Sequence, residues 1–270
     1  MPELPEVETT LRGIAPAMLA QRIEAMVIRN PALRWPVPAA VQQAVGQTVS
    51  KLQRRAKYIL IEFPVGGLLC HLGMSGSLRI CEAGAAPRKH DHFDIVLAND
   101  LCIRYHDPRR FGTLLWWDEP AGQHPLLRDL GPEPLLDEFT GQHLWQRSRG
   151  LSVAVKNFIM NGKVVVGVGN IYASEALYMA GIHPTRPAGR VSLARYQALA
   201  AAIKDVLGRA IRQGGTTLRD FTNSSGEPGY FAQDLLVYER EGKGCFQCGA
   251  AIRRKVIGQR SSYYCPRCQR

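Results

Sequence analysis

Hydrophobic residues between positions 21 and 117 fall in short runs that Gly, Pro, Asn and Asp separate. Short runs rich in β-branched and aromatic residues, bounded by turn formers, predict β-strands. The runs are IEAMVIRN (23–30), KYILIEF (57–63), GLLCHLGMSGSLRI (67–80), HFDIVLAND (92–100), LCIRYHD (101–107) and FGTLLWW (111–117). Asn99 and Asp100 stand between two of these runs and favour a tight hairpin turn. This half of the chain is therefore predicted to be a β-sandwich or barrel.

Helical spacing replaces the strand pattern on both sides of this region. Val7, Leu11 and Ile14 share one helical face behind Pro5, which suits the first turn of a helix. After a Pro- and Gly-containing linker, LGPEPLL, at 130–136, two apolar series predict further helices. They are Leu151, Val155, Phe158 and Ile159, and then Leu193, Tyr196, Ala200, Ile203, Leu207 and Ile211, with Ser192 as N-cap and Gly214 as C-terminal stop.

These segments predict an α+β multidomain protein. Its expected domains are 1–131, 135–231 and 236–270. No apolar run reaches the roughly 18 residues of a membrane helix, and the acidic N-terminus lacks the features of a signal peptide. We therefore expect a cytoplasmic location and no membrane partner.

Positive charge is in excess. The chain has 34 Lys and Arg against 23 Asp and Glu, a net charge of +11, and a pI near 9.5. Residues 238–270 hold only Glu239 and Glu241 as acids, against eight bases, Arg240, Lys243, Arg253, Arg254, Lys255, Arg260, Arg267 and Arg270. Such a distribution favours a nucleic acid as partner, although a positive charge could also serve solubility alone.

Four cysteines give the most specific chemical signal. Cys245-x2-Cys248 and Cys265-x2-Cys268 have the spacing of two knuckles that bind one tetrahedral zinc ion. A disulfide pair is the alternative, which a reducing cytosol disfavours. Four protein ligands leave no open position, so the predicted Zn²⁺ is structural. The basic segment between the pairs is typical of a β-hairpin that meets phosphates.

The first residues, MPELPEVETT, raise a question of chemistry. The initiator Met is normally removed before a small residue, which would leave Pro2 with a free secondary amine. An α-amino group has a pKa near about 8, so part of it is uncharged and nucleophilic at neutral pH. The carboxyl groups of Glu3 and Glu6 could donate and accept protons beside this amine. The alternative is a plain helix entrance whose acids complement the helix dipole.

Several short sequence motifs, spread along the chain, decide between a nucleophile and a plain helix entrance. They are PELPEVETTLRGI (2–14), RRAKY (54–58), HLGMSGSLRI (71–80), DPRRFG (107–112), GVGNIYASEALYMAGIHP (167–184), QGGTTLRDF (213–221) and the four-cysteine end. Together they resemble bacterial formamidopyrimidine-DNA glycosylase from end to end. The resemblance implies an N-terminal β-sandwich with flanking helices, a helix-two-turn-helix domain and a zinc-ribbon hairpin.

The resemblance also implies a catalytic set. Pro2 would attack C1′ of a damaged nucleotide, and Glu3 would be the general acid and base, with Glu6 in support. Lys57 would assist elimination at a phosphate. Arg260 would contact the phosphates around the extruded nucleotide, where its fixed donors suit two phosphates.

A glycosylase must flip its target base and fill the gap. The family residues that do this correspond to Met74, Arg109 and Phe111. Core packing is the alternative for Met74 and Phe111, but the Gly, Ser and Pro residues around them favour exposed loop tips.

Further contacts to the DNA backbone are implied for His90, Arg109, Lys156 and Asn170, and for Arg149, which stands beside Gly150 where the family often has a lysine. TTLRDFTNSSGEPGYF (216–231) is expected to contain a loop that covers the lesion. RKHDHFD (88–94) could suggest a metal site, but strand alternation would divide its side chains between two faces.

The sequence therefore predicts a monomeric base-excision-repair enzyme that acts on double-stranded DNA. It would remove oxidised purines and then cut the strand by β- and δ-elimination. Two alternatives stay open, an endonuclease VIII type enzyme for oxidised pyrimidines and a non-catalytic zinc-ribbon DNA-binding protein. PELPE at the start favours the purine enzyme over the first of these.

Overall fold

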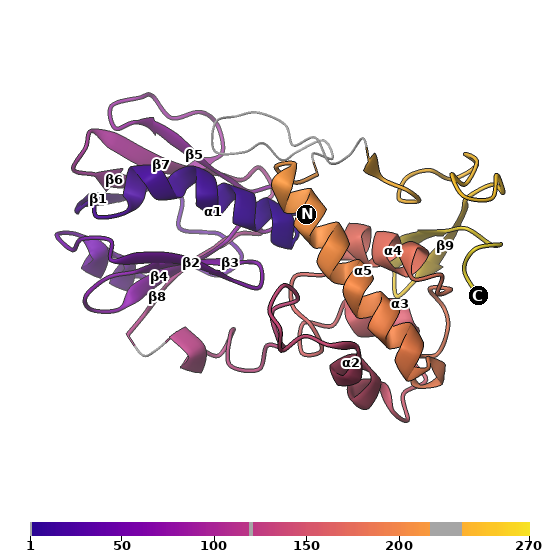
Figure 1. The fold of residues 1–270 in the computed structure, drawn as a ribbon. Coiled ribbons are helices and arrows are strands. Elements are labelled where there is room, and N and C mark those ends of the chain that lie inside the picture. The colour runs from indigo at the N-terminus through magenta and orange to yellow at the C-terminus, as the bar shows by residue number, and fades with distance from the viewer. Residues whose placement is uncertain (1, 119–120, 217–233) are drawn as a thin grey trace. The chain divides into compact units, whose positions relative to one another are not determined.

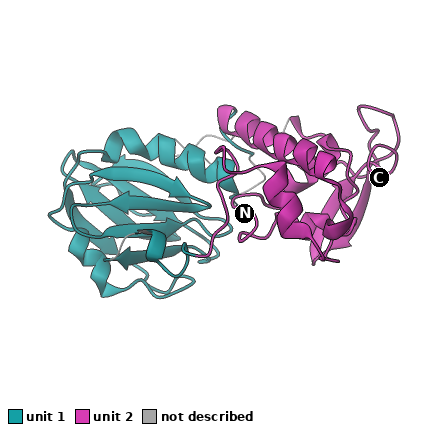
Figure 2. Ribbon diagram, turned by 60° about the horizontal axis from the view of Figure 1, so that its bottom comes forward, with its two compact units in different colours: residues 1–128, 213–230 teal, residues 129–212, 231–270 magenta. Residues whose placement is uncertain are grey.

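The structure is a computed structural model that describes residues 2–118, 121–216 and 234–270. The chain forms two compact units, Met1–Arg128 with Gln213–Tyr230, and Asp129–Arg212 with Phe231–Arg270 (Figure 2). The predicted lesion-covering loop at 216–231 lies, apart from Thr216, outside the described residues. In the described part of the chain, no helix combines the length and apolarity that crossing a membrane requires.

Unit 1 contains two four-stranded antiparallel sheets (Figure 1). One sheet has the order β1 (Ile23–Ile28), β6 (Asp91–Leu97), β7 (Leu101–His106) and β5 (Ser77–Glu82). The other has the order β2 (Lys51–Arg55), β3 (Tyr58–Glu62), β4 (Gly67–His71) and β8 (Thr113–Trp117). Helix α1 (Leu4–Met18) contributes to one core with apolar residues of both sheets. The predicted sandwich and N-terminal helix are confirmed, with short 3-10 helices η1 (Ala39–Ala44) and η2 (Ala121–Gln123) in addition.

Two details of unit 1 differ from the sequence prediction. Strand β2 lies in none of the predicted runs, because only Leu52 in KLQRR is apolar. The run at 67–80 is two strands, β4 and β5, joined by a loop at 72–76. Gly73 in this loop has a φ of +74°, which a strand does not accommodate. The hairpin turn at Asn99 and Asp100 is confirmed between β6 and β7.

Unit 2 is helical and ends in a β-hairpin. Its elements are α2 (Gly141–Ser148), α3 (Val155–Ile159), α4 (Asn170–Met179), the 3-10 helix η3 (Ala188–Arg190), α5 (Leu193–Arg212), β9 (Arg253–Ile257) and β10 (Arg260–Tyr264). Helix α5 matches the predicted series, and the Arg195 backbone N–H donates to the Ser192 hydroxyl at 3.4 Å. The predicted helix around 151–159 covers only 155–159. The Ala188 N–H donates to the Val153 carbonyl and the Val155 N–H to that of Arg186, so this backbone pairs with another segment instead.

The four-cysteine end packs on helix α4. A small buried cluster joins Tyr178 of α4 to Val237, Cys245, Ile252 and Cys265. The predicted hairpin between the cysteine pairs is β9 and β10, paired antiparallel from Arg260 opposite Ile257 to Tyr264 opposite Arg253. The four-cysteine segment and its hairpin therefore pack against helix α4.

Candidate functional site

The first residues of the chain are held by reciprocal capping of helix α1. Pro2 and Glu3 are buried. The Glu3 N–H donates to Glu6 Oε2 at 2.7 Å, in a capping box that also joins the Glu3 side chain to the backbone of Glu6. Glu6 Oε1 accepts the Thr216 N–H at 2.8 Å, where Gly215 approaches closely. Glu6 thus connects the N-terminal segment, which bears the predicted nucleophile Pro2, to Thr216, which lies 210 positions further along the chain.

The predicted lysine lies in the two-residue turn between β2 and β3, formed by Ala56 and Lys57. Arg54, at the end of β2, donates to Glu8 of helix α1 at 2.8 Å and to the Ala56 carbonyl at 2.9 Å. Burial alone would raise the pKa of Glu8, but hydrogen bonds from Arg54 and Arg12 outweigh it and hold that pKa below its usual value. This charged contact fixes the turn that carries Lys57 beside the beginning of helix α1.

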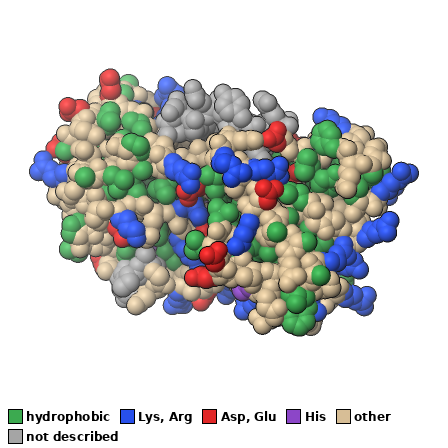
Figure 3. Space-filling view, in the orientation of Figure 1, with side chains coloured by type: hydrophobic (Ala, Val, Ile, Leu, Met, Phe, Trp, Pro, Cys, Tyr) green, Lys and Arg blue, Asp and Glu red, His purple; other side chains and the backbone are tan. Residues whose placement is uncertain are grey.

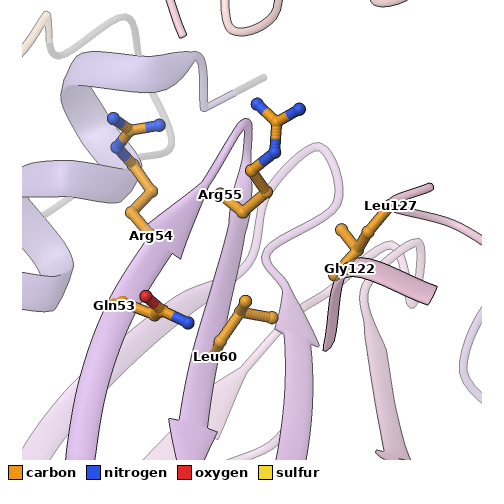
Figure 4. Close-up of a pocket in the computed structure, with 6 residues that line it drawn as sticks. All are labelled: Gln53, Arg54, Arg55, Leu60, Gly122 and Leu127. Atoms are coloured by element: carbon orange, nitrogen blue, oxygen red, sulfur yellow. The ribbon is translucent and has the colours of Figure 1, made fainter. Parts of the chain in front are cut away.

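A pocket of about 140 Å³ lies beside the same turn. Figure 4 shows Arg54 and Arg55 at the end of β2, with their guanidinium groups extended away from Leu60. The pocket is lined by Gln53, Arg54, Arg55, Leu60, Gly122 and Leu127. Because this lining has neither a carboxylate nor a nucleophile, it offers no means of general acid or covalent catalysis.

His71 is a candidate site residue that the sequence analysis did not single out, although it begins the HLGMSGSLRI block. The Gly73 N–H donates to His71 Nδ1 at 3.0 Å, so the neutral ring carries its proton on Nε2. Burial, together with the positive charges of Lys57 and Arg34, lowers the pKa of His71 to about 4. Tyr58, the neighbour of Lys57, lies opposite His71 in the pairing of β3 with β4, so the structure brings the Lys57 turn close to His71.

We expect His71 to make the stability of the protein fall as the pH is lowered from 6.5 to 4. In this range the unfolded histidine takes up a proton that the folded one does not, so stability is complete above about 6.5 and drops by about 3 kcal/mol toward pH 4. Urea unfolding of the wild type and His71→Asn across this range measures the difference. Parallel stability curves for the two proteins would contradict the expectation.

The three predicted gap-filling residues lie on two adjacent loops of unit 1. Met74 is 37% exposed and Phe111 is 42% exposed, which excludes core packing for both. The Arg109 guanidinium carbon lies 5.1 Å from the centre of the Phe111 ring. A Cβ on Gly73 would come within 2.5 Å of the Phe111 backbone, so only glycine lets the two loops approach so closely. The structure therefore places these three exposed side chains on neighbouring loops, with Arg109 over the Phe111 ring.

Asp107 holds both loops and was not predicted as a site residue. Its side chain is fully buried. Oδ1 accepts the Ser75 hydroxyl at 2.6 Å and the Arg109 N–H at 3.2 Å. Oδ2 accepts the Tyr105 hydroxyl at 3.0 Å and the Gly112 N–H at 2.9 Å. One carboxylate thus fixes the loop that bears Met74 against the loop that bears Arg109 and Phe111.

Asp107→Asn is expected to destabilise unit 1 by about 3 kcal/mol. Each carboxylate oxygen accepts one backbone N–H, so the asparagine NH₂ must face a donor at either position. Urea unfolding measures the loss. The control is Asp100→Asn, an exposed hairpin residue with a φ of 61°, which asparagine tolerates. Equal stability of the two variants would show that Asp107 does not hold the loops.

Lys156 and Asn170 lie in a network inside unit 2. Lys156 is fully buried, and its Nζ donates to Asn170 Oδ1 at 2.7 Å and to the Ser262 hydroxyl at 2.6 Å. Asn170 Nδ2 donates to the Ser261 carbonyl at 3.0 Å and to the Tyr238 hydroxyl at 3.2 Å. These bonds join helices α3 and α4 to the hairpin. Tyr238 is a further polar residue of this site that the sequence analysis did not identify.

The four cysteines meet in one cluster, as predicted. Their sulfur atoms all lie within 4.8 Å of one another. Cys245 and Cys268 are 3.9 Å apart and Cys248 and Cys265 are 3.4 Å apart. A tetrahedral zinc ion with Zn–S bonds of about 2.3 Å needs sulfur atoms about 3.8 Å apart. The site therefore fits one structural Zn²⁺, and within the described ranges no other group of His, Cys, Asp and Glu is arranged to hold a metal.

Arg260 is the first residue of β10 and is exposed beside the tip of the hairpin. Gly258 at this tip has a φ of +54°, and a Cβ on it would lie 2.6 Å from the Asn157 side chain of α3. The tip is thereby seated against the helical part of unit 2. Figure 3 shows Lys and Arg side chains along the edge where the hairpin and the C-terminal segment lie.

The remaining predicted DNA contacts are His90 and Arg149. His90 has a φ of 73°, and its ring lies 6.0 Å from that of His106. Arg149 donates to the Trp145 carbonyl at 2.9 Å and to that of Val191 at 3.0 Å. In the 88–94 segment, Asp91 pairs with Arg79 at 2.8 Å and with His106 at 2.9 Å, and His92 contacts the Asp107 carbonyl.

The chain thus combines a capped N-terminal segment on a β-sandwich, a helical unit and a four-cysteine hairpin. Three family descriptions match the chain in order: formamidopyrimidine-DNA glycosylase N-terminal domain (1–114), formamidopyrimidine-DNA glycosylase H2TH domain (130–222), and zinc finger found in FPG and IleRS (242–270). The chain belongs to the formamidopyrimidine-DNA glycosylase family.

Individual relatives agree over the full length. The chain is 59% identical to the formamidopyrimidine-DNA glycosylase of Methylococcus capsulatus, and the alignment covers all of both proteins. It is similar to a Lactococcus lactis FPG mutant in complex with Fapy-dG containing DNA, with a TM-score of 0.91, 30% identity and full coverage of both chains. The same values hold for wild-type Lactococcus lactis Fpg (MutM) in complex with DNA that contains an oxidised pyrimidine.

Proposed function

We propose that this protein is a bifunctional DNA glycosylase and AP lyase that removes oxidised purines, such as 8-oxoguanine and formamidopyrimidines, from double-stranded DNA. The observation that carries the proposal is the buried, capped segment at Pro2 and Glu3, which is braced by Glu6 and adjoins the charged contact that fixes the Lys57 turn. Family membership supplies the substrate class.

Catalysis would begin at the amine of Pro2. Its nitrogen lone pair attacks C1′ of the damaged nucleotide, the bond from C1′ to the base breaks, and the base leaves with a proton. The sugar ring then opens as the C1′–O4′ bond breaks and the proton of the amine passes to O4′. This leaves an iminium between C1′ and Pro2, which is an electron sink. Loss of a C2′ proton then expels the 3′ phosphate, and loss of a C4′ proton expels the 5′ phosphate. Glu3, which follows Pro2 in the chain, would carry these protons.

Lys57 and His71 would hold the phosphates beside the reacting sugar. Lys57 supplies a positive charge, and neutral His71 presents its Nε2–H. Both groups suit a phosphate monoanion and the further negative charge that builds up as each phosphate leaves.

The exposed cluster of Met74, Arg109 and Phe111 would occupy the gap left by the flipped nucleotide. An apolar side chain and an aromatic ring can replace the missing stacking, and a guanidinium can bond to the orphaned partner base. Asp107 fixes the backbone on both sides of this cluster and so keeps it rigid.

In unit 2, Arg260 and the hairpin bases would bind phosphates. Lys156 and Asn170 would support this binding, because their hydrogen bonds join α4 to the hairpin. Asn170 also begins α4, and N–H groups at the start of a helix suit a phosphate. Zinc, when bound, supplies a structural crosslink between the cysteine pairs. His90 and Arg149 are assigned to the DNA backbone on the family resemblance alone.

Borohydride trapping tests the proposal. A duplex with 8-oxoguanine should give a covalent protein–DNA complex, and a duplex with an oxidised pyrimidine should give less of it. Preference for the pyrimidine duplex would support the endonuclease VIII type of activity. Tight binding without trapping would identify a non-catalytic DNA-binding protein.

We also propose that the protein acts as a monomer in the cytoplasm, at the nucleoid.

A further inference from the structure

Tyr178 connects helix α4 directly to the zinc site. It is the ninth residue of the helix, its side chain is only 8% exposed, and its hydroxyl oxygen lies 3.1 Å from Cys245 Sγ. The two residues belong to the same buried cluster as Val237 and Ile252. A polar contact in such apolar surroundings is shielded from water, which strengthens it.

The direction of this hydrogen bond follows from the chemistry of the site. A cysteine that binds zinc does so as a thiolate, which has no proton to donate. The Tyr178 hydroxyl must therefore donate and Cys245 Sγ accept. A donor to a thiolate makes a charge-assisted bond, whereas the bond to a neutral thiol is weak.

We propose that Tyr178 slows the loss of zinc, although it does not bind the metal itself, because its hydroxyl donates a hydrogen bond to the Cys245 thiolate. The hydroxyl holds Cys245 Sγ beside helix α4 where the sulfur binds zinc, so zinc binding and the seating of Cys245 on the helix reinforce each other. This role concerns metal retention and is independent of the glycosylase activity proposed above.

The same helix contributes a second anchor. Glu175 is buried three residues before Tyr178, and its carboxylate accepts the backbone N–H groups of Leu236, Val237 and Tyr238 at 2.8 to 3.0 Å. Positions three apart lie on the same side of a helix. Glu175 thus holds the chain that leads into the first cysteine pair, and Tyr178 holds the first cysteine itself.

Tyr178→Phe tests the proposal, because it removes one oxygen and keeps the ring in the cluster. Removal of a residue that hydrogen-bonds to a metal ligand typically lowers metal affinity by about 10- to 100-fold. We expect zinc release to a chromophoric chelator to be at least about 10-fold faster than in the wild type. The matched control is Tyr264→Phe, whose ring packs on His183 with centroids 4.5 Å apart. It should release zinc at the wild-type rate.

Cobalt substitution separates the hydrogen bond from packing. In Co²⁺-loaded protein, loss of a donor to a thiolate should move the sulfur-to-cobalt charge-transfer band to lower energy in Tyr178→Phe and leave it unmoved in Tyr264→Phe. Fast zinc release with an unmoved band would assign the effect to packing and overturn the proposal. A moved band with wild-type zinc release would overturn the role in retention, and no change in either would overturn both.

Discussion

Pro2→Gly is expected to lower the rate of base excision by at least about 100-fold and to slow formation of the borohydride-trapped complex to the same extent. The pyrrolidine ring of proline fixes the position of the nitrogen relative to its own Cα, so the lone pair has a restricted direction relative to the buried segment that follows. Glycine keeps an amine but frees this angle, and a misplacement of about 1 Å at a reacting atom can cost about 100-fold in rate. Single-turnover excision from an 8-oxoguanine duplex measures the effect.

The control for Pro2→Gly is Pro5→Ala. Pro5 lies in the first turn of helix α1, so this variant also removes a proline from the same segment but leaves the terminal amine intact. It should retain excision within a few-fold. Both variants should bind DNA like the wild type, because neither removes a residue that is proposed to contact phosphates or to fill the gap. A crosslinked sugar found by mass spectrometry on a residue other than Pro2 would refute the proposed nucleophile.

The zinc ligands and the general fold were predictable because their signals are local. Two Cys-x2-Cys pairs define a tetrahedral site through their spacing alone. Alternating apolar runs define strands for a similar reason, since each strand must bury one face. Helix α2 gave a weaker signal. It has only eight residues, of which Leu144 is the one large buried apolar side chain.

The supporting residues could not be predicted in the same way, because their partners are distant in sequence. Asp107 and Ser75 are 32 positions apart, and Lys156 and Ser262 are 106 apart. The HLGMSGSLRI and DPRRFG blocks contain His71 and Asp107, but nothing in the blocks indicates which residue holds the loops together. Lys156 illustrates the same limit. Its charge predicts a phosphate contact, but its burial and its hydrogen bonds to Asn170 and Ser262 were not predictable from the sequence.

Cys245→Ser is expected to eliminate zinc binding and to weaken DNA binding by about 100-fold. The hairpin of β9 and β10 has only two strands, and such a hairpin is at best marginally stable alone. Structural zinc in small domains contributes about 10 to 16 kcal/mol of binding free energy, which is folding free energy for the segment that it crosslinks. Without it, only the small cluster around Val237 and Ile252 and the hydrogen bonds of Lys156 and Asn170 hold the hairpin, which weakens its attachment to helix α4.

The weaker DNA binding should have an electrostatic signature. Arg260 and the other bases of residues 238–270 keep their charges in the variant but not their fixed positions, so fewer counterions are released on binding. The slope of log K against log salt should therefore fall by about one for each phosphate that the protein no longer neutralises. Zinc content by atomic absorption and DNA affinity at several salt concentrations measure the two effects. Cys81→Ser, a half-buried cysteine of β5, is the control. A zinc-free Cys245→Ser protein with the wild-type affinity and salt slope would show that the ribbon does not bind DNA.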